Sequence, residues 1–146
     1  MKSDTISDDQ EWVNPKLEYR NSKQIRMIKN QKSKPYDLED RTLMFSMNVR
    51  ALVKQLPKNL SNIEDGKQLI RSSGSVGSNY IEANESLSKK DFVMRIKICR
   101  KEIKESRYWL RLIDINDDEQ ETNRNDLIQE ATELMNIFGS ILQKSK

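Results

Sequence analysis

The side chains best suited to acid–base chemistry stand in two carboxylate pairs, Glu82 with Glu85 and Glu102 with Glu105. Each pair is spaced i, i+3, which places both carboxylates on one helix face, and exposed helices produce such pairs by chance. The 146-residue sequence contains no histidine, which excludes a Ser-His-Asp triad, a histidine-ligated zinc or haem, and a Glu-x-x-His di-iron site. Carboxylates alone would favour Mg²⁺ or Mn²⁺ with low affinity. We therefore expect no enzymatic activity, no metal and no cofactor.

Nucleophilic chemistry is limited in the same way. Cys99 is the single cysteine, so neither an intrachain disulfide nor a four-cysteine metal site can form, and a reducing compartment is favoured. Serines and lysines are numerous, but nothing in the sequence pairs a serine with a lysine as nucleophile and base. No apolar run approaches the roughly 18 residues of a membrane span, and the polar start lacks the apolar core of a signal peptide. These features predict a small, soluble, cytoplasmic protein.

Cationic side chains are the better candidates for binding a ligand, and the first group lies near the N-terminus. Residues 16–34 contain seven basic side chains and one acid, whereas residues 35–146 hold equal numbers of each sign, so the net charge of +3 originates at the N-terminus. This stretch is rich in Asn, Gln, Ser and Lys and poor in large apolar residues. That composition predicts a disordered or weakly helical N-terminal arm over residues 1–35. Its candidate phosphate-binding residues are Lys16, Arg20, Lys23, Arg26, Lys29, Lys32 and Lys34.

A second basic group lies between Ser88 and Ile115, where nine basic residues accompany four acids. Five of the basic residues fall close to one helical stripe: Lys90, Lys97, Lys101, Lys104 and Arg111. Such a stripe is commonly a solvated face with i,i+4 ion pairs, for example Asp91/Arg95. It could also attract the acidic residues 116–146 across a bundle or subunit interface. The alternative is a phosphate-binding surface, beside which Tyr108 and Trp109 would stack on bases, although aromatic residues there more often belong to a core or an interface.

Helices must position these side chains, because residues 36–146 show helical periodicity and no useful alternation of period two. The expected helices cover about 37–56, 62–84, 88–113 and 122–143. Asp37 is a plausible N-cap, and Ser88 followed by Asp91 resembles a capping box. The strongest periodicity is a heptad seam in the third helix, and its members are Phe92, Ile96, Cys99, Ile103, Ser106, Leu110 and Ile113.

The first expected helix has an apolar stripe at Met44, Met47 and Ala51, and Phe45, Leu52 and Leu56 widen it. In the fourth, one side holds Leu127, Ala131, Leu134, Phe138 and Ile141. Short connections force consecutive helices to run antiparallel. Residues 36–146 are therefore predicted to form an all-α, antiparallel, up-down-up-down four-helix bundle.

The second helix is unusual because seven of the eight residues 72–79 are small or polar. A glycine in a helix interior costs about 1 kcal/mol relative to alanine, so Gly74 and Gly77 need a reason. A P-loop is excluded, since no Gly-Lys-Ser/Thr ending and no preceding strand are present. Close helix packing is favoured, because Gly74 and Ser78 are spaced i, i+4. The apolar residues around these glycines cover more than one face of the helix, which predicts burial against both the bundle and a second subunit. The candidate packing residues are Gly74, Gly77, Ser78, Tyr80 and Trp109.

Several motifs resemble one family. They are Tyr-Asp-Leu-Glu-Asp-Arg-Thr at 36–42, Ile-Glu-Asp-Gly-Lys-Gln-Leu at 63–69, the glycine- and serine-rich stretch 71–84, and the helix 89–110 with Arg-Lys-Glu at 100–102 and Tyr-Trp-Leu at 108–110. Together, over about residues 36–143, they resemble the bacterial four-helix bundle proteins called 23S rRNA intervening-sequence proteins. The long N-terminal arm departs from the family pattern.

The resemblance implies a ring-like homopentamer of antiparallel bundles. Members of that family were first noticed as reading frames inside insertions of large-subunit rRNA genes, and no catalytic residues are established for them. A distant relative is the accessory protein of diversity-generating retroelements, a basic pentamer that binds reverse transcriptase and RNA. The near-neutral bundle of the present chain differs from that strongly basic relative.

Two functional hypotheses follow. The first is a non-enzymatic oligomer that binds RNA through the basic arm and the third helix, with subunit number multiplying the phosphate contacts. The alternative is a protein-interaction scaffold without a nucleic-acid role, in which the arm is a solubilising tail.

Overall fold

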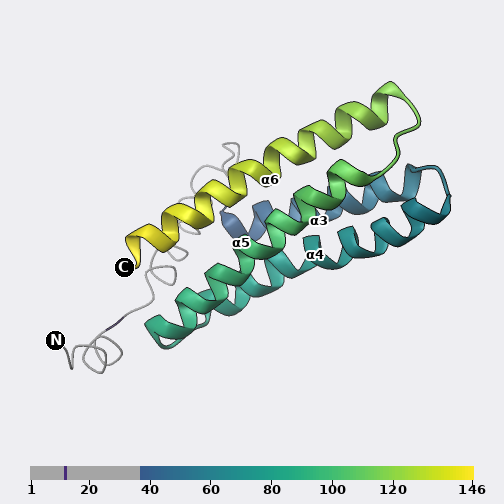
Figure 1. Ribbon diagram of the computed structural model, residues 1–146. Helices are drawn as coiled ribbons and strands as arrows, with labels where there is room; N and C mark the ends of the chain where they lie inside the picture. The colour runs from purple at the N-terminus through teal and green to yellow at the C-terminus, as the bar shows by residue number, and fades with distance from the viewer. Residues whose placement is uncertain (1–11, 13–36) are drawn as a thin grey trace, which may run out of the picture.

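The computed structural model describes residue 12 and residues 37–146 (Figure 1). The described part consists of four helices, α3 (Leu38–Gln55), α4 (Leu60–Asn84), α5 (Lys89–Leu112) and α6 (Asp118–Lys144). The helices run alternately up and down, so the predicted all-α antiparallel four-helix bundle is confirmed.

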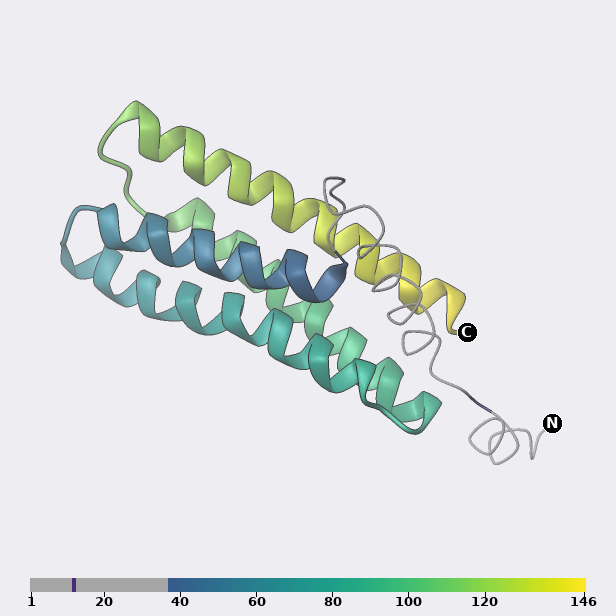
Figure 2. The same cartoon turned by 180° about the vertical axis from the view of Figure 1, so that it is seen from behind.

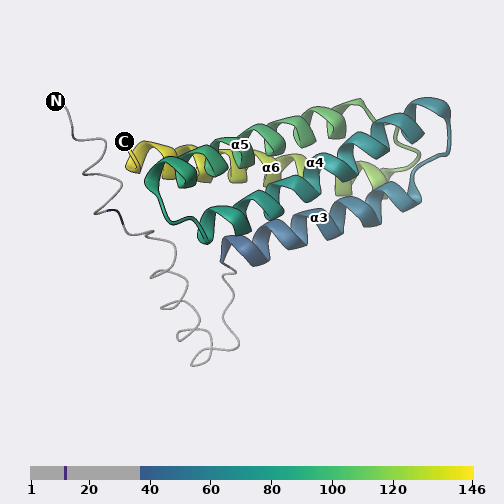
Figure 3. The same cartoon turned by 90° about the horizontal axis from the view of Figure 1, so that it is seen from below.

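Each helix contacts its two neighbours in the square: α3 with α4, α4 with α5, α5 with α6, and α6 with α3. The α3–α4 and α5–α6 connections lie together at one end of the bundle, as the view from behind shows (Figure 2). The α4–α5 turn lies at the opposite end with the start of α3 and the end of α6. Seen from below, α4 and α3 lie side by side along their length (Figure 3). The α4–α5 contact is the most extensive, and the α3–α6 contact is the loosest.

All four helices begin at a side-chain N-cap. Asp37 Oδ1 accepts a hydrogen bond from the Asp40 amide at 2.9 Å, and Ser88 Oγ accepts one from the Asp91 amide at 3.1 Å, as predicted for both positions. The other two helices begin earlier than predicted. Asn59 caps α4, and Asp117 caps α6 by accepting from the Gln120 amide at 2.8 Å. Residues 117–121 contain no apolar side chain, so periodicity gave no signal there.

The core is built from one face of each helix. Every member of the heptad seam is buried, which confirms this prediction for α5, and the face of α6 from Leu127 to Phe138 is buried as well. The predicted stripe of α3 is wrong in its main members: Met44, Met47 and Ala51 are exposed. The buried stripe of α3 instead contains Phe45, Val49 and Leu52. Two overlapping apolar stripes occur on this helix, and only the second of them enters the core.

Two buried amides fasten the connections at one end of the bundle. Asn62 Nδ2 donates to the carbonyls of Pro57 at 2.9 Å and Asp114 at 3.1 Å, while its Oδ1 accepts from the Asp114 amide at 2.8 Å. Gln120 Nε2 donates to the Gln55 carbonyl, and Gln120 Oε1 accepts from the Asn116 amide, both at 2.9 Å. The α3–α4 and α5–α6 connections are thus bonded through side chains of α4 and α6.

Trp12 lies at the opposite end, where α5 begins. Its ring centroid is 5.5 Å from that of Phe92, and the side chain is partly buried against the core. The rest of the predicted arm, residues 1–11 and 13–35, lies outside the described residues. Among the helices of the described part, none combines the length and the apolar character that crossing a membrane requires.

Candidate nucleic-acid interface

The burial of the heptad seam determines which α5 residues face outward. Lys90, Lys97, Lys104 and Arg111 recur every seven residues, and all four are exposed together with Lys101. A helix rises 1.5 Å per residue, so successive members of this column are about 10.5 Å apart along the helix axis. We call these five residues the α5 basic stripe. It extends along most of one side of α5.

Few anions neutralise the α5 basic stripe. Lys101 Nζ lies 4.0 Å from Glu102 Oε2, and this is the one ion pair that the stripe forms with residues 37–146. Neither of the i,i+4 pairs predicted for a solvated face, Asp91/Arg95 and Lys101/Glu105, forms. Arg95 instead donates to Asn79 Oδ1 at 3.0 Å, and Glu105 accepts from Arg71 at 2.8 Å.

Two acidic residues of α6, Glu130 and Glu133, pair with α3 rather than with α5. Arg41 binds Glu130 through two hydrogen bonds, Nε to Oε2 at 2.8 Å and Nη2 to Oε1 at 2.9 Å, and its Nη2 also donates to Glu133 at 2.7 Å. The pKa of Glu133 is lowered by the hydrogen bond from the Gln129 amide and by Arg41. Glu130 and Glu133 therefore already have a cationic partner, and among residues 37–146 only Glu102 forms an ion pair with the stripe.

Aromatic side chains border the stripe near its C-terminal end. Tyr108 is 57% exposed, and its ring meets the half-buried ring of Trp109 edge to face with centroids 5.1 Å apart. Trp109 packs against the core, and its Nε1 is buried without a hydrogen-bond partner in the described part of the chain. Tyr108 thus belongs to the exposed surface, and Trp109 joins that surface to the core.

The glycines of α4 lie against α3. A Cβ placed on Gly77 would lie 3.1 Å from Thr42 Oγ1, and one placed on Gly74 would lie 3.8 Å from Arg50 Nη2. Ser78 is exposed and donates to the Ser75 carbonyl, so it lies on another face of the helix. A Cβ on Gly66 would lie 3.3 Å from Val53 Cγ1 of α3, so the close approach of α3 and α4 depends on Gly77 and Gly66 more than on Gly74.

Other small residues of α4 meet α5. Ser72 Oγ and Ser106 Oγ are both fully buried and 2.8 Å apart, which lets these two helices approach closely at their centre. Tyr80 is buried near Phe138, at a ring distance of 6.0 Å, and desolvation raises the pKa of its hydroxyl. A second subunit was expected to cover part of the apolar surface of α4. Of the apolar residues around its glycines, only Ile81 is exposed, at 49%; the others are Leu69, Ile70, Val76 and Tyr80.

The thiol of Cys99 lies in the core of the bundle. Cys99 is fully buried, its Sγ donates to the Val76 carbonyl at 3.4 Å, and burial raises the pKa of this thiol to about 12. Within residues 12 and 37–146, no group of three or more Cys, Asp or Glu side chains is arranged to hold a metal ion.

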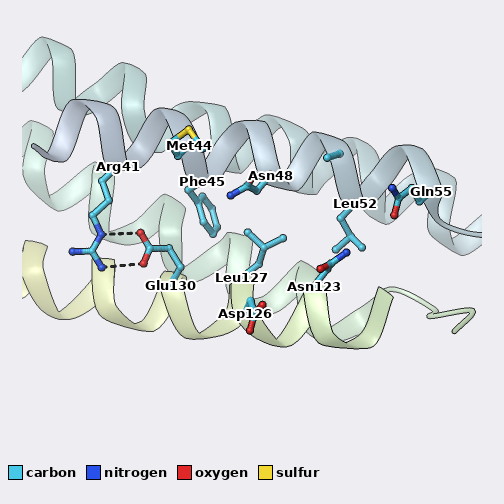
Figure 4. A pocket seen from close by; sticks show the side chains of 11 residues that line it. Arg41, Met44, Phe45, Asn48, Leu52, Gln55, Asn123, Asp126, Leu127 and Glu130 are labelled. Carbon is cyan, nitrogen blue, oxygen red and sulfur yellow. Dashed lines mark hydrogen bonds and ion pairs between the residues drawn. The ribbon is translucent and has the colours of Figure 1, made fainter. Parts of the chain in front are cut away.

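A groove separates α3 from α6 (Figure 4). Its volume is about 720 Å³, and its floor includes Phe45, Leu52 and Leu127. The Arg41–Glu130 pair closes one end, as the dashed contacts in Figure 4 show. This is where the exposed residues Met44 and Ala51 lie, which explains why apolar side chains on that side of α3 do not enter the core.

The predicted site residues therefore divide into three groups. The α5 basic stripe is gathered on one exposed surface, whereas Gly74, Gly77 and Tyr80 take part in packing within the bundle. The seven basic residues of the arm, from Lys16 to Lys34, lie outside the described residues.

Comparison with known proteins connects this arrangement to a family. The 23S rRNA-intervening sequence protein family matches residues 36–140, from just before α3 into the last turns of α6. The chain belongs to this family. The 23S rRNA-intervening sequence family match thus includes the whole α5 basic stripe and the glycines of α4.

A solved structure is also similar to this 23S rRNA-intervening sequence protein. It is a protein with unknown function from the S23 ribosomal protein family of Bacteroides thetaiotaomicron, 27% identical, with a TM-score of 0.61. The similarity covers 73% of this chain and 98% of that chain, so the region outside it corresponds to about the length of the N-terminal segment. No curated protein matches the chain.

Proposed function

We propose that this protein is a non-enzymatic RNA-binding protein whose bundle binds phosphates through the α5 basic stripe. The observation that supports the proposal best is the exposure of five cations on one face of α5, four of them without an ion pair to any described residue. Lysine and arginine side chains in a line bind the phosphates of a nucleic-acid strand and release its counterions. Two of the α6 carboxylates, Glu130 and Glu133, bind Arg41 instead of the stripe.

Salt dependence tests the proposal directly. The triple variant Lys97→Gln, Lys101→Gln and Lys104→Gln removes three adjacent stripe charges. If each contacts one phosphate, the slope of log K against log salt falls by about 0.7 for each charge on single-stranded RNA and by about 0.9 on a duplex. Fluorescence anisotropy with labelled RNA over a salt series measures this slope.

A matched control has the same change in net charge. Lys54, Lys58 and Lys144 are exposed, lie outside α5 and form no ion pair with residues 37–146. Replacing these three by glutamine should leave the slope close to that of the unaltered protein. Equal slopes for the two triple variants would contradict a role for the stripe.

The arm adds a second part to the proposal. Residues 16–34 would supply up to seven further phosphate contacts, because their basic side chains face only one acid in that stretch. Replacing the seven cations by glutamine in the full chain should lower the slope further. An unchanged slope in that variant would limit RNA binding to the bundle.

Assembly would increase the affinity. The pentamer implied by the family resemblance would present several stripes and several arms to one RNA, which raises avidity without new contacts. Sedimentation velocity with and without RNA measures the number of subunits. A monomer that binds RNA with the same affinity would remove assembly from the proposed function.

A protein-docking role is the second candidate, and the α3–α6 groove favours it. A groove of about 720 Å³ with an apolar floor is lined in part by the exposed side chain of Met44. A scaffold would retain one stoichiometric protein partner after nuclease treatment. Loss of all partners on nuclease treatment would favour RNA binding.

A further inference from the structure

The most informative exposed side chain on α5 is an aromatic one. Tyr108 has more than half of its surface exposed although it neighbours the core residue Leu110 and the half-buried Trp109. An isolated exposed aromatic residue is ordinary. Tyr108 is notable because it lies among cations on the same side of α5.

Two cations flank Tyr108 on the helix surface. Lys104 precedes it by four residues and Arg111 follows it by three, and residues at these spacings are neighbours on a helix. Lys101 lies seven residues before Tyr108, which places it in the same column two turns away. A flat aromatic ring therefore lies within a row of phosphate-binding groups.

The Tyr108 ring contacts one other aromatic ring among the described residues. Its edge-to-face contact with Trp109, with centroids 5.1 Å apart, occupies no more than one of its faces. Trp109 is itself anchored against the core. At least one face of the Tyr108 ring is thus available to stack on another flat ring.

We propose that Tyr108 stacks on an unpaired base and that the substrate class of the α5 basic stripe is single-stranded RNA, an inference that rests on the proposed function. Bases of a duplex are already stacked and are recognised by shape and backbone, whereas unpaired bases stack on aromatic side chains. Lys104 and Arg111 would bind the phosphates on either side of the stacked nucleotide. Stacking on the Tyr108 ring would make the protein prefer single-stranded RNA over a duplex, and the cations would supply the affinity for phosphates.

The test compares two probes with the full chain: an oligouridine of about 16 nucleotides, a length typical of single-stranded binding sites, and a fully paired RNA duplex of matched length. Tyr108→Ala should weaken oligouridine binding about fivefold or more, and it should leave duplex binding and the salt slope unchanged because no charge is lost. Tyr108→Phe keeps the ring and should retain the affinity for oligouridine.

Met94→Ala is the matched control, because Met94 is 46% exposed and lies in the same column two heptads before Tyr108. If Met94→Ala weakens oligouridine binding as much as Tyr108→Ala, the effect is general apolar contact and the stacking inference is wrong. Unchanged oligouridine binding by Tyr108→Ala, or equal weakening on both probes, also overturns it. If the unaltered protein binds neither probe at low salt, the proposed function fails and the inference falls with it.

Discussion

A β-carbon on Gly77 would lie 3.1 Å from Thr42 Oγ1 and 3.4 Å from Thr42 Cβ. The hydroxyl cannot easily move away, because Thr42 is buried and its Oγ1 donates to the Leu38 carbonyl at 2.7 Å. The approach of α3 and α4 therefore requires a residue without a side chain at position 77.

Gly77→Ala should destabilise the bundle. Alanine gains about 1 kcal/mol in helix propensity, but the forced contact with Thr42 costs about 1–3 kcal/mol, so we expect a net loss of roughly 1 kcal/mol in urea unfolding. Gly74→Ala is the matched control: its Cβ would meet Arg50 at an ordinary 3.8 Å, so it should gain about 0.5–1 kcal/mol. Equal stabilisation by both substitutions would contradict the steric argument.

Removing the Thr42 hydroxyl should partly rescue the alanine variant. Thr42→Ala eliminates the 3.1 Å contact and leaves the more ordinary one to Cβ. A double-mutant cycle of Gly77→Ala and Thr42→Ala should therefore show favourable coupling of about 0.5–1 kcal/mol. Additive effects would locate the strain elsewhere.

Arg41→Gln should weaken the joint between α3 and α6. Arg41 binds Glu130 through two parallel hydrogen bonds, and both side chains are largely shielded from solvent. We expect a loss of about 1 kcal/mol in the free energy of unfolding at neutral pH. Lys67→Gln, which breaks the exposed Lys67–Glu64 pair, is the control and should have no measurable effect.

The contribution of this cluster should also depend on pH. The pKa of Glu133 is held below its ordinary 4.5 by the Gln129 amide and then by Arg41. A carboxylate whose pKa is lowered in the folded state stabilises the fold at pH values above its unfolded pKa. This stabilisation is lost as the pH falls through the folded pKa. The Tm difference between the unaltered protein and Arg41→Gln should therefore shrink in acid, and a constant difference would exclude the carboxylates as its source.

Asn62→Ala should be among the most costly polar substitutions. It removes the buried amide that bonds the Pro57 carbonyl and both backbone groups of Asp114, and it leaves these partly buried backbone groups without their side-chain partner. Each such group costs about 1–3 kcal/mol, so a loss of roughly 3 kcal/mol is expected in denaturant unfolding. Asn125→Ala, on the exposed surface of α6, should change stability by less than about 0.5 kcal/mol. Similar losses for both would show that the α3–α4 and α5–α6 connections do not depend on Asn62.

Cys99 should resist alkylation in the folded protein. The thiol is fully buried, and burial raises its pKa from 9.0 to about 12, so thiolate is scarce at mildly alkaline pH. Since the raised pKa belongs to the folded state, the unfolded thiol ionises first, and stability is lost as the pH rises from about 9 toward 12. Mass spectrometry after iodoacetamide treatment should find one modification per chain in denaturant and none without it. Rapid native modification would contradict this burial.

The fold was predictable because its signals are local. The heptad seam of α5, the caps at Asp37 and Ser88 and the short connections each depend on residues near one another in the sequence. Periodicity does not mark the start of α6, because residues 117–121 contain no apolar side chain, although Asp117 and Gln120 have the spacing of a capping box.

The long-range contacts were not predictable in the same way. Which of two apolar stripes on α3 enters the core depends on where the other helices lie. The pairing of Arg41 with Glu130 joins residues 89 positions apart. Asn62 and Gln120 also bind backbone groups far away in the sequence: Asn62 binds Asp114, 52 positions away, and Gln120 binds Gln55, 65 positions away. For the candidate site, the sequence indicated the α5 basic stripe, but only the structure showed that the α6 carboxylates bind elsewhere.

The two tryptophans provide a built-in optical readout of the two ends of the molecule. Trp12 rests on Phe92 at the start of α5, and Trp109 lies beside Tyr108 near its end, so along the helix axis they are separated by about 25 Å. Single Trp→Phe variants would make each indole a separate fluorophore. Emission from Trp109 in one variant would then follow events beside the α5 basic stripe, while emission from Trp12 in the other would follow the contact between Trp12 and Phe92, without an added dye.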